Sequence, residues 1–158
     1  KGARDATARD AAIYTLAFSA PTESFNRAVN DAQQITRKVG QEQRFLNGRP
    51  LHPGDFEDAT DLLATCDLKQ VRSLPDSHTF FDLVEALIID FQGKNDASVP
   101  KAYFEVRYRI GVPFGQFDIF DKNVRQSFVY APSNPPTNPP RVEVVLPAHT
   151  FKKIGEAL

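Results

Sequence analysis

Residues 77–92 read SHTFFDLVEALIIDFQ and carry the clearest helix signal in the chain. From Phe80 to Phe91, apolar residues recur at i, i+1, i+4, i+7, i+8 and i+11, which predicts an amphipathic helix with a wide apolar face. Turn-forming residues at 75–77 mark the start of this helix, and Gly93 marks its end. A face this broad favours packing across a β-sheet.

The residues after position 101 change to a period of two, which is typical of a β-strand. Between residues 103 and 110 apolar side chains alternate with polar ones, and shorter strand signals follow at 117–120, 127–130 and 141–146. Strands that follow one another after a series of helices predict an antiparallel sheet. We therefore expect an α+β fold in which N-terminal helices precede a sheet of about four strands that packs on helix 77–92.

The first half of the chain predicts mainly helices. An Ala-rich arm or helix is expected over 1–20, a second helix over 22–39, and a third over 55–66 with Asp55 as its N-cap. Asn47-Gly48 is a turn signal between short apolar runs and predicts a small hairpin or a tucked loop.

Length and composition restrict the class of protein. The 158 residues are 41% hydrophobic and have a formal net charge of -1, which fits one globular α+β domain over 1–158. Residues 51–92 hold nine acidic and two basic side chains, so an acidic middle lies between two mildly basic flanks. No apolar run approaches the roughly 20 residues that a membrane helix needs.

Signals of catalysis and of metal binding are absent from the sequence. The residues His52, His78 and His149 lie in no metal-ligand spacing, and His78 is expected to be solvated in the first turn of its helix. Cys66, the only cysteine, falls on the predicted buried stripe and favours a core thiol in a reducing intracellular compartment. We expect no cofactor and no metal, and the chain leans away from being an enzyme.

The best candidate surface is the polar side of the strand at 103–110. Tyr103, Arg107 and Arg109 would lie on one face, where an aromatic ring and two guanidinium groups can hold carboxylates, phosphates or unstacked bases. The alternative is that Glu105 pairs with its arginine neighbours and the row serves only the sheet.

The second candidate is the Pro-rich segment at residues 132–140. Pro136, Pro139 and Arg141 fit a PxxPx-basic pattern, which aromatic grooves recognise in a polyproline II conformation. The alternative is a stiff connection between two strands.

Together these features favour a non-catalytic binding or assembly subunit. We expect protein–protein contacts, with a partner or a second copy of the chain in an oligomer, through the exposed sheet face and the Pro-rich loop.

Two alternatives remain open from the sequence. The order of elements is loosely like that of cone-shaped α+β folds, which hold a small molecule or an active site in a pocket. Here that pocket would lie between helix 77–92 and the sheet, lined by Phe80, Phe114, Phe117 and Tyr130. A single-stranded nucleic-acid binder would use Tyr103, Arg107 and Arg109, but the near-zero net charge disfavours it.

Overall fold

The computed structural model of the chain describes residues 6–18, 25–52, 54–55, 61–94, 100–109, 114–133 and 143–158. The Pro-rich motif of Pro136, Pro139 and Arg141 lies outside these residues, as does most of the predicted first half of helix 55–66.

The described elements are six helices and seven strands. The helices are α1 (Ala8–Phe18), α2 (Phe25–Gln34), α3 (Leu62–Thr65), α4 (Lys69–Arg72), α5 (Phe80–Phe91) and α6 (Ala148–Glu156). The strands are β1 (Thr36–Arg37), β2 (Gln43–Leu46), β3 (Arg49–Pro50), β4 (Tyr103–Arg109), β5 (Phe114–Asp121), β6 (Val124–Ala131) and β7 (Glu143–Pro147). Among the described residues, no helix is long and apolar enough to cross a membrane.

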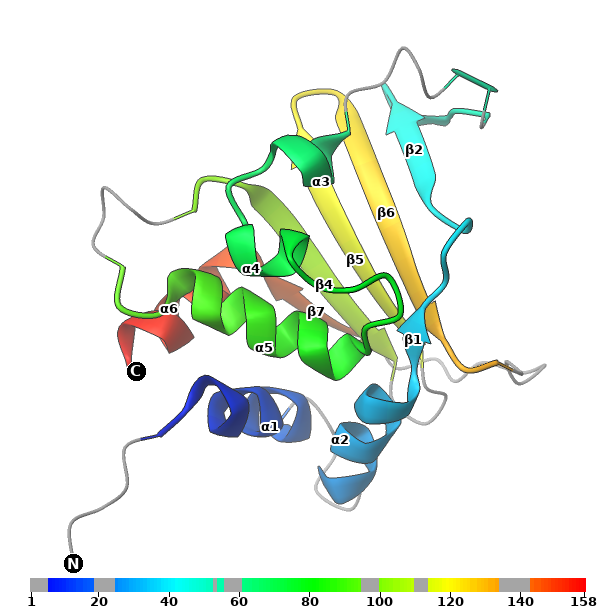
Figure 1. Cartoon of the computed structure of the whole chain (residues 1–158). Coiled ribbons are helices and arrows are strands. Elements are labelled where there is room, and N and C mark those ends of the chain that lie inside the picture. The colour runs from blue at the N-terminus through cyan, green and yellow to red at the C-terminus, as the bar shows by residue number, and fades with distance from the viewer. Residues whose placement is uncertain are drawn as a thin grey trace, which may run out of the picture.

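The strands form one antiparallel sheet in the order β3-β2-β6-β5-β4-β7, and β1 pairs with β6 beside this path. The described helices lie on one face of the sheet, with α5 running across it and α1 and α2 below (Figure 1). The α+β class is confirmed, but the expected count of about four strands is wrong. The three additional strands, β1 to β3, are two to four residues long and precede α5. The sequence predicts strands β2 and β3 only as a separate hairpin, and β1 has two residues, too few for an alternation to be recognised in a sequence.

Helix α5 confirms the helix predicted from its apolar period. It begins at Thr79 rather than in the turn residues before it, because Thr79 and Asp82 form a capping box. The Thr79 hydroxyl accepts a hydrogen bond from Asp82 N at 3.1 Å, and the Asp82 carboxylate accepts one from Thr79 N at 2.8 Å. Gly93, with φ of 64°, follows the helix end as predicted.

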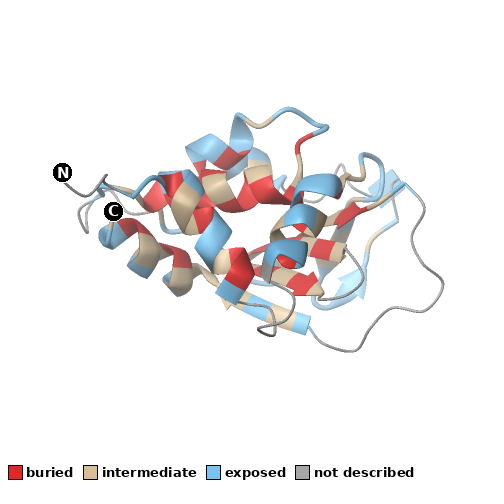
Figure 2. Cartoon of the chain, turned by 90° about the horizontal axis from the view of Figure 1, so that it is seen from below, coloured by how far each residue is buried: buried red, intermediate tan, exposed pale blue. Residues whose placement is uncertain are grey.

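The core fills the space between α5 and the sheet. The Phe80 ring lies directly over Gly115 of β5, and a Cβ at that glycine would overlap the ring. Phe80 also stacks on Tyr108 and meets Tyr130 edge-on, with ring centroids 5.3 and 5.4 Å apart. Figure 2 shows the buried residues gathered where helices and sheet face each other.

The predicted hairpin is confirmed as β2 and β3, in which Phe45 pairs with Pro50 and Leu46 with Arg49. Asn47 and Gly48 have φ values of 51° and 76°, as a two-residue hairpin turn of the left-handed type requires.

The helix predicted over 22–39 is too long, because α2 ends at Gln34 and the next residues pair with β6. Ile35 is fully buried at this junction, whereas Val39, which the helical period had placed on the buried face, is 66% exposed. Pairing with β6 overrides the local helical pattern.

The prediction of a helix over 55–66 is also wrong for the described residues of that range. Only α3 is helical there, and its N-cap is Asp61, which accepts a hydrogen bond from Ala64 N at 3.1 Å. The proposed cap Asp55 instead accepts a hydrogen bond from His52 N at 3.3 Å. Cys66 is not a core thiol, because it follows α3 and is half-buried.

Helix α4 is a single turn that a distant side chain supports. The carboxylate of Asp90, buried in α5, accepts hydrogen bonds from Gln70 N at 2.9 Å and from Val71 N at 3.3 Å. Burial raises the pKa of Asp90 and outweighs these hydrogen bonds, which lower it. A one-turn helix is marginal by itself, so this contact fixes α4 against α5.

Two neighbouring residues of α5 test whether this helix seals the core. Ile88 is fully buried and Ile89 is 37% exposed, so the pair differs in burial and not in chemistry. We expect Ile88→Ala to lower the free energy of unfolding by about 2–5 kcal/mol. Ile89→Ala should lower it by less than about 1.5 kcal/mol, because less apolar area is lost. Urea unfolding measures both, and equal losses would contradict the packing.

Candidate functional site: the uncovered face of the sheet

The face of the sheet that points away from the described helices is the candidate site. Strand β4 confirms the predicted alternation, with Tyr103, Glu105, Arg107 and Arg109 on this face. Directly opposite residues of paired strands point to the same side. Register therefore adds residues from β5, β6, β2 and β7 to this uncovered face, among them Phe120, Asp118, Arg125, Phe45, Val145 and Glu143.

Both arginines of the predicted site are engaged by carboxylates. Arg107 Nη2 lies 3.1 Å from Glu105 Oε2, its Nε lies 3.6 Å from Asp118 Oδ2, and its Nη1 lies 3.7 Å from Glu143 Oε1. Arg109 Nε lies 3.4 Å from the other oxygen of Glu143. The arginines therefore pair with carboxylates of the same sheet face, as the alternative interpretation of the sequence expected. Their positive charges are balanced by these neighbours.

Asp118 is the centre of this face, and sequence reasoning missed its role. Its side chain is fully buried although none of the described helices covers it. The carboxylate accepts hydrogen bonds from Gln116 Nε2 at 2.8 and 3.0 Å and from the Ser127 hydroxyl, beside the ion pair with Arg107. A buried charge needs such partners, so these contacts hold β4, β5 and β6 side chains in one arrangement.

An aromatic row crosses the same face at the other end of the strands. The rings of Tyr103 and Phe120 have centroids 5.3 Å apart, and the guanidinium of Arg125 lies 3.8 Å from the centroid of Phe45. Tyr103 is 56% exposed, and Val145 is 47% exposed near the charged centre. The face therefore offers exposed apolar surface beside charges that are already paired.

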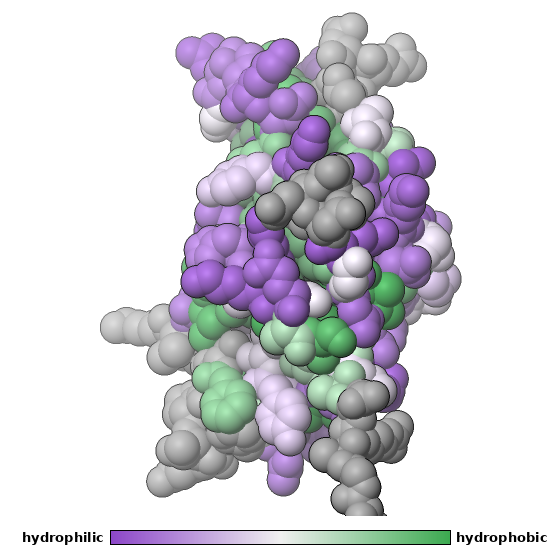
Figure 3. Space-filling model, turned by 90° about the vertical axis from the view of Figure 1, so that its left-hand side faces the viewer, coloured by the Kyte–Doolittle hydropathy of each residue, from purple (hydrophilic) through white to green (hydrophobic). Residues whose placement is uncertain are grey.

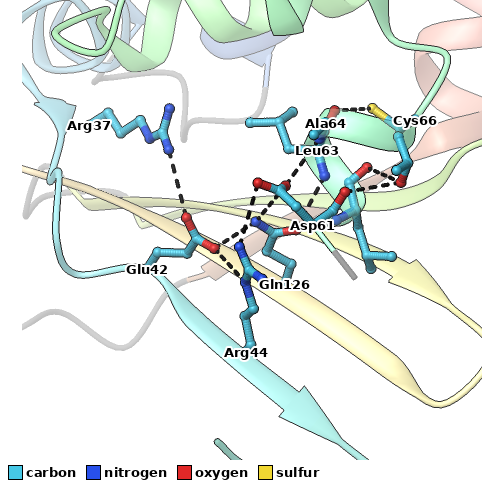
Figure 4. A network of polar contacts seen from close by, with 10 residues as sticks. Arg37, Glu42, Arg44, Asp61, Leu63, Ala64, Cys66 and Gln126 are labelled. Carbon is cyan, nitrogen blue, oxygen red and sulfur yellow. Dashed lines mark hydrogen bonds and ion pairs between the residues drawn. The ribbon is translucent and has the colours of Figure 1, made fainter. Parts of the chain in front are cut away.

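A second polar cluster lies on the helix side of the sheet and links β2, β6 and α3 (Figure 4). Glu42 Oε1 accepts hydrogen bonds from Arg44 Nε at 2.9 Å and from Gln126 Nε2 at 2.6 Å. Arg44 Nη2 lies 3.5 Å from Asp61, and Arg37 lies 3.9 Å from Glu42. Gln126 Oε1 accepts hydrogen bonds from the first backbone N–H groups of α3 at 2.7 and 3.2 Å.

The titration of Asp61 fits a structural role for this cluster. Burial raises the pKa of Asp61, but the hydrogen bonds from Ala64 and Gln126 and the charge of Arg44 outweigh it and lower the pKa overall. A lowered pKa keeps the carboxylate charged, as an ion pair requires, and opposes a role as a proton donor near neutral pH. We assign the cluster to anchoring α3 on the sheet.

The prediction that His78 is solvated is wrong. Its Nδ1 lies 2.6 Å from the Pro75 carbonyl, to which it donates, so Nε2 accepts a hydrogen bond from the Tyr130 hydroxyl at 2.6 Å. Burial is the main cause that lowers the pKa of His78 and keeps the ring neutral. His52 and His149 are exposed, and no group of three metal-ligating side chains occurs among the described residues.

The four aromatic residues named for an interior pocket do not share one space. Phe80, Phe117 and Tyr130 are buried core rings. Phe114 lies on the uncovered face, where the Arg109 guanidinium is 4.7 Å from its centroid.

A separate apolar surface lies on α1. Tyr14 and Phe18 are 60% and 73% exposed, and their rings stack at 6.1 Å. The side seen in Figure 3 is mostly polar in its upper half, and apolar side chains gather lower down, towards the level of α1. The Ala-rich N-terminal helix was a candidate contact from the sequence, but these two rings were not singled out.

Comparisons with protein-family models, with curated proteins and with solved structures give no match.

The anchoring role of Gln126 is tested by removing its amide. We expect Gln126→Ala to lower the free energy of unfolding by about 1–3 kcal/mol, because the buried N–H of Leu62 would lose its acceptor. Gln70→Ala is the matched control, since Gln70 is exposed, and should change little. Chemical denaturation compares the two, and a control as damaging as Gln126→Ala would refute the role.

The buried His78 predicts a pH dependence of stability. Its folded pKa lies below the unfolded value of 6.5, so its contribution is present above pH 6.5 and is lost as pH falls through the folded pKa. Urea unfolding between pH 8 and pH 5 should therefore show a steeper loss for the wild type than for His78→Gln. The other titrating groups are common to both proteins, so their effects cancel in the difference between the two. Parallel plots of unfolding free energy against pH would contradict the prediction.

Proposed function

We propose that the chain is a non-catalytic assembly module that pairs with a second copy of itself through the uncovered face. The observation that carries this proposal is the one-sided fold, in which the described helices cover one face of the sheet and leave the other open. A sheet face with exposed Tyr103 and Val145 favours a partner that covers it.

The charges of the face favour self-pairing over an oppositely charged partner. Its carboxylates (Glu105, Asp118 and Glu143) are matched by its guanidinium groups (Arg107, Arg109 and Arg125), and most of them contact each other. Two copies therefore meet without net repulsion. A symmetric pair also lets each Tyr103 and Val145 meet an apolar surface of the same kind.

The size of the face is also suitable. Five strands about 4.8 Å apart and roughly 20 Å long span on the order of 500 Å² in projection. This is comparable with the roughly 800 Å² of accessible surface that each partner buries in a stable complex.

The structure gives less support to the other two functions, single-stranded nucleic-acid binding and small-molecule binding in an interior pocket. Affinity for a nucleic-acid backbone comes from cationic side chains that neutralise phosphates and release their counterions. Arg107 instead lies beside three carboxylates, which already neutralise it. An interior pocket would need space among Phe80, Phe117 and Tyr130, which pack as core. The Pro-rich motif with Pro139 stays a prediction of a second contact.

A charge placed on the uncovered face tests the pairing. Val145 of the edge strand β7 is opposite Arg107 in the sheet, so Val145→Arg adds a cation to the contact beside Arg107 without removing an existing ion pair. We expect sedimentation equilibrium to show a dimer for the wild type and at least a tenfold weaker association for Val145→Arg. Val39→Arg, at a 66% exposed position off this face, is the control and should stay dimeric.

The α1 surface supplies the competing outcome. If Tyr14→Arg abolishes the dimer while Val145→Arg leaves it intact, the interface lies on α1 and the proposal fails. A monomeric wild type at millimolar concentration would also refute it.

A further inference from the structure

A hollow of about 610 Å³ opens at one end of the sheet, between α3 and the paired ends of β4 and β5. In Figure 1 this place lies between α3 and the neighbouring ends of the two strands. Small-molecule sites in proteins have volumes of about 300–1,000 Å³. The hollow adjoins the Glu42 and Gln126 cluster through Leu62, whose N–H donates to Gln126, and it is not the interior space predicted from the sequence.

The floor of the hollow is apolar. Leu62 and Ile119 are 4% and 2% exposed, and Phe120 and Cys66 are half-buried beside them. Burial is the main cause that raises the pKa of the Cys66 thiol, which also donates a hydrogen bond to the Leu63 carbonyl at 3.3 Å. The thiol is therefore mostly protonated near neutral pH, contributes a small apolar surface to the floor and reacts slowly.

One wall of the hollow is fixed by Asp67. Its two carboxylate oxygens accept hydrogen bonds from Lys101 N at 2.7 Å and from Ala102 N at 3.2 Å. These bonds tie the residues that precede β4 to the segment after α3. Because both oxygens hold backbone N–H groups in place, Asp67 belongs to the frame of the hollow.

The rim carries two lysines from different segments. Lys101 precedes β4, and Lys122 lies in the turn after β5. Within the part of the chain that the structure describes, neither amine has an ion pair or a hydrogen bond. The carboxylates of Asp67 and Asp121 offset this positive charge, so the rim favours a ligand with at most one negative charge.

We propose that this hollow binds a small amphipathic monocarboxylate, with its apolar body on Leu62 and Ile119 and its carboxylate between the lysine amines. An apolar floor with a few polar groups at the rim is the usual build of a small-molecule site.

Binding here does not depend on self-pairing, although Tyr103 and Phe120 belong to both surfaces. Titrations are therefore run on the wild type and on Val145→Arg. A variant that loses only the dimer then tests the assembly proposal. A variant that loses only ligand binding tests the proposal for the hollow.

The probe is 4-phenylbutyrate, titrated by calorimetry. We expect one saturable site per chain. Lys101→Ala and Lys122→Ala should each raise the dissociation constant about two- to fivefold, as the loss of a single exposed ion pair does. Lys153→Ala, which removes an exposed amine from α6, is the matched control and should bind as the wild type does.

Cys66 reports where the probe lies, because it lines the hollow and is the only cysteine of the chain. Saturating 4-phenylbutyrate should slow its alkylation by iodoacetamide severalfold. An unchanged alkylation rate, or the neutral analogue 4-phenyl-1-butanol binding as tightly as the acid, would overturn the proposal, as would the absence of any binding.

Discussion

The structure depends on the packing of α5 against the sheet, and that packing depends on Phe80 lying over Gly115. Because the glycine lacks a Cβ, the helix approaches the strands closely and the ring also meets Tyr108 and Tyr130. The rings thus fill the space where a cone-shaped fold would hold a ligand. We therefore assign contact to an outer surface, the uncovered face of the sheet.

Polar contacts between distant segments complete what the apolar core begins. The one-turn helices α3 and α4 donate their N-terminal hydrogen bonds to Gln126 of β6 and Asp90 of α5. The opposite face is ordered in the same way by Asp118, which joins side chains of three strands. A sheet face held rigid in this manner loses little side-chain entropy when a partner covers it.

The features predicted from the sequence are those with a strong local period or turn signal. Helix α5, the alternation of β4 and the Asn47-Gly48 hairpin belong to this class. The features missed depend on residues far apart in the chain. The anchoring of α3 joins positions more than sixty residues apart, and no local pattern marks Asp118 as buried or His78 as the partner of Tyr130.

The central claim is that the side of the sheet without helices is a contact surface for a second copy. Isotope-filtered nuclear magnetic resonance on mixed labelled and unlabelled chains tests it most directly. The account predicts intermolecular contacts to the methyl groups of Val145 and to the ring of Tyr103. Intermolecular contacts confined to α1, around Tyr14, would contradict it.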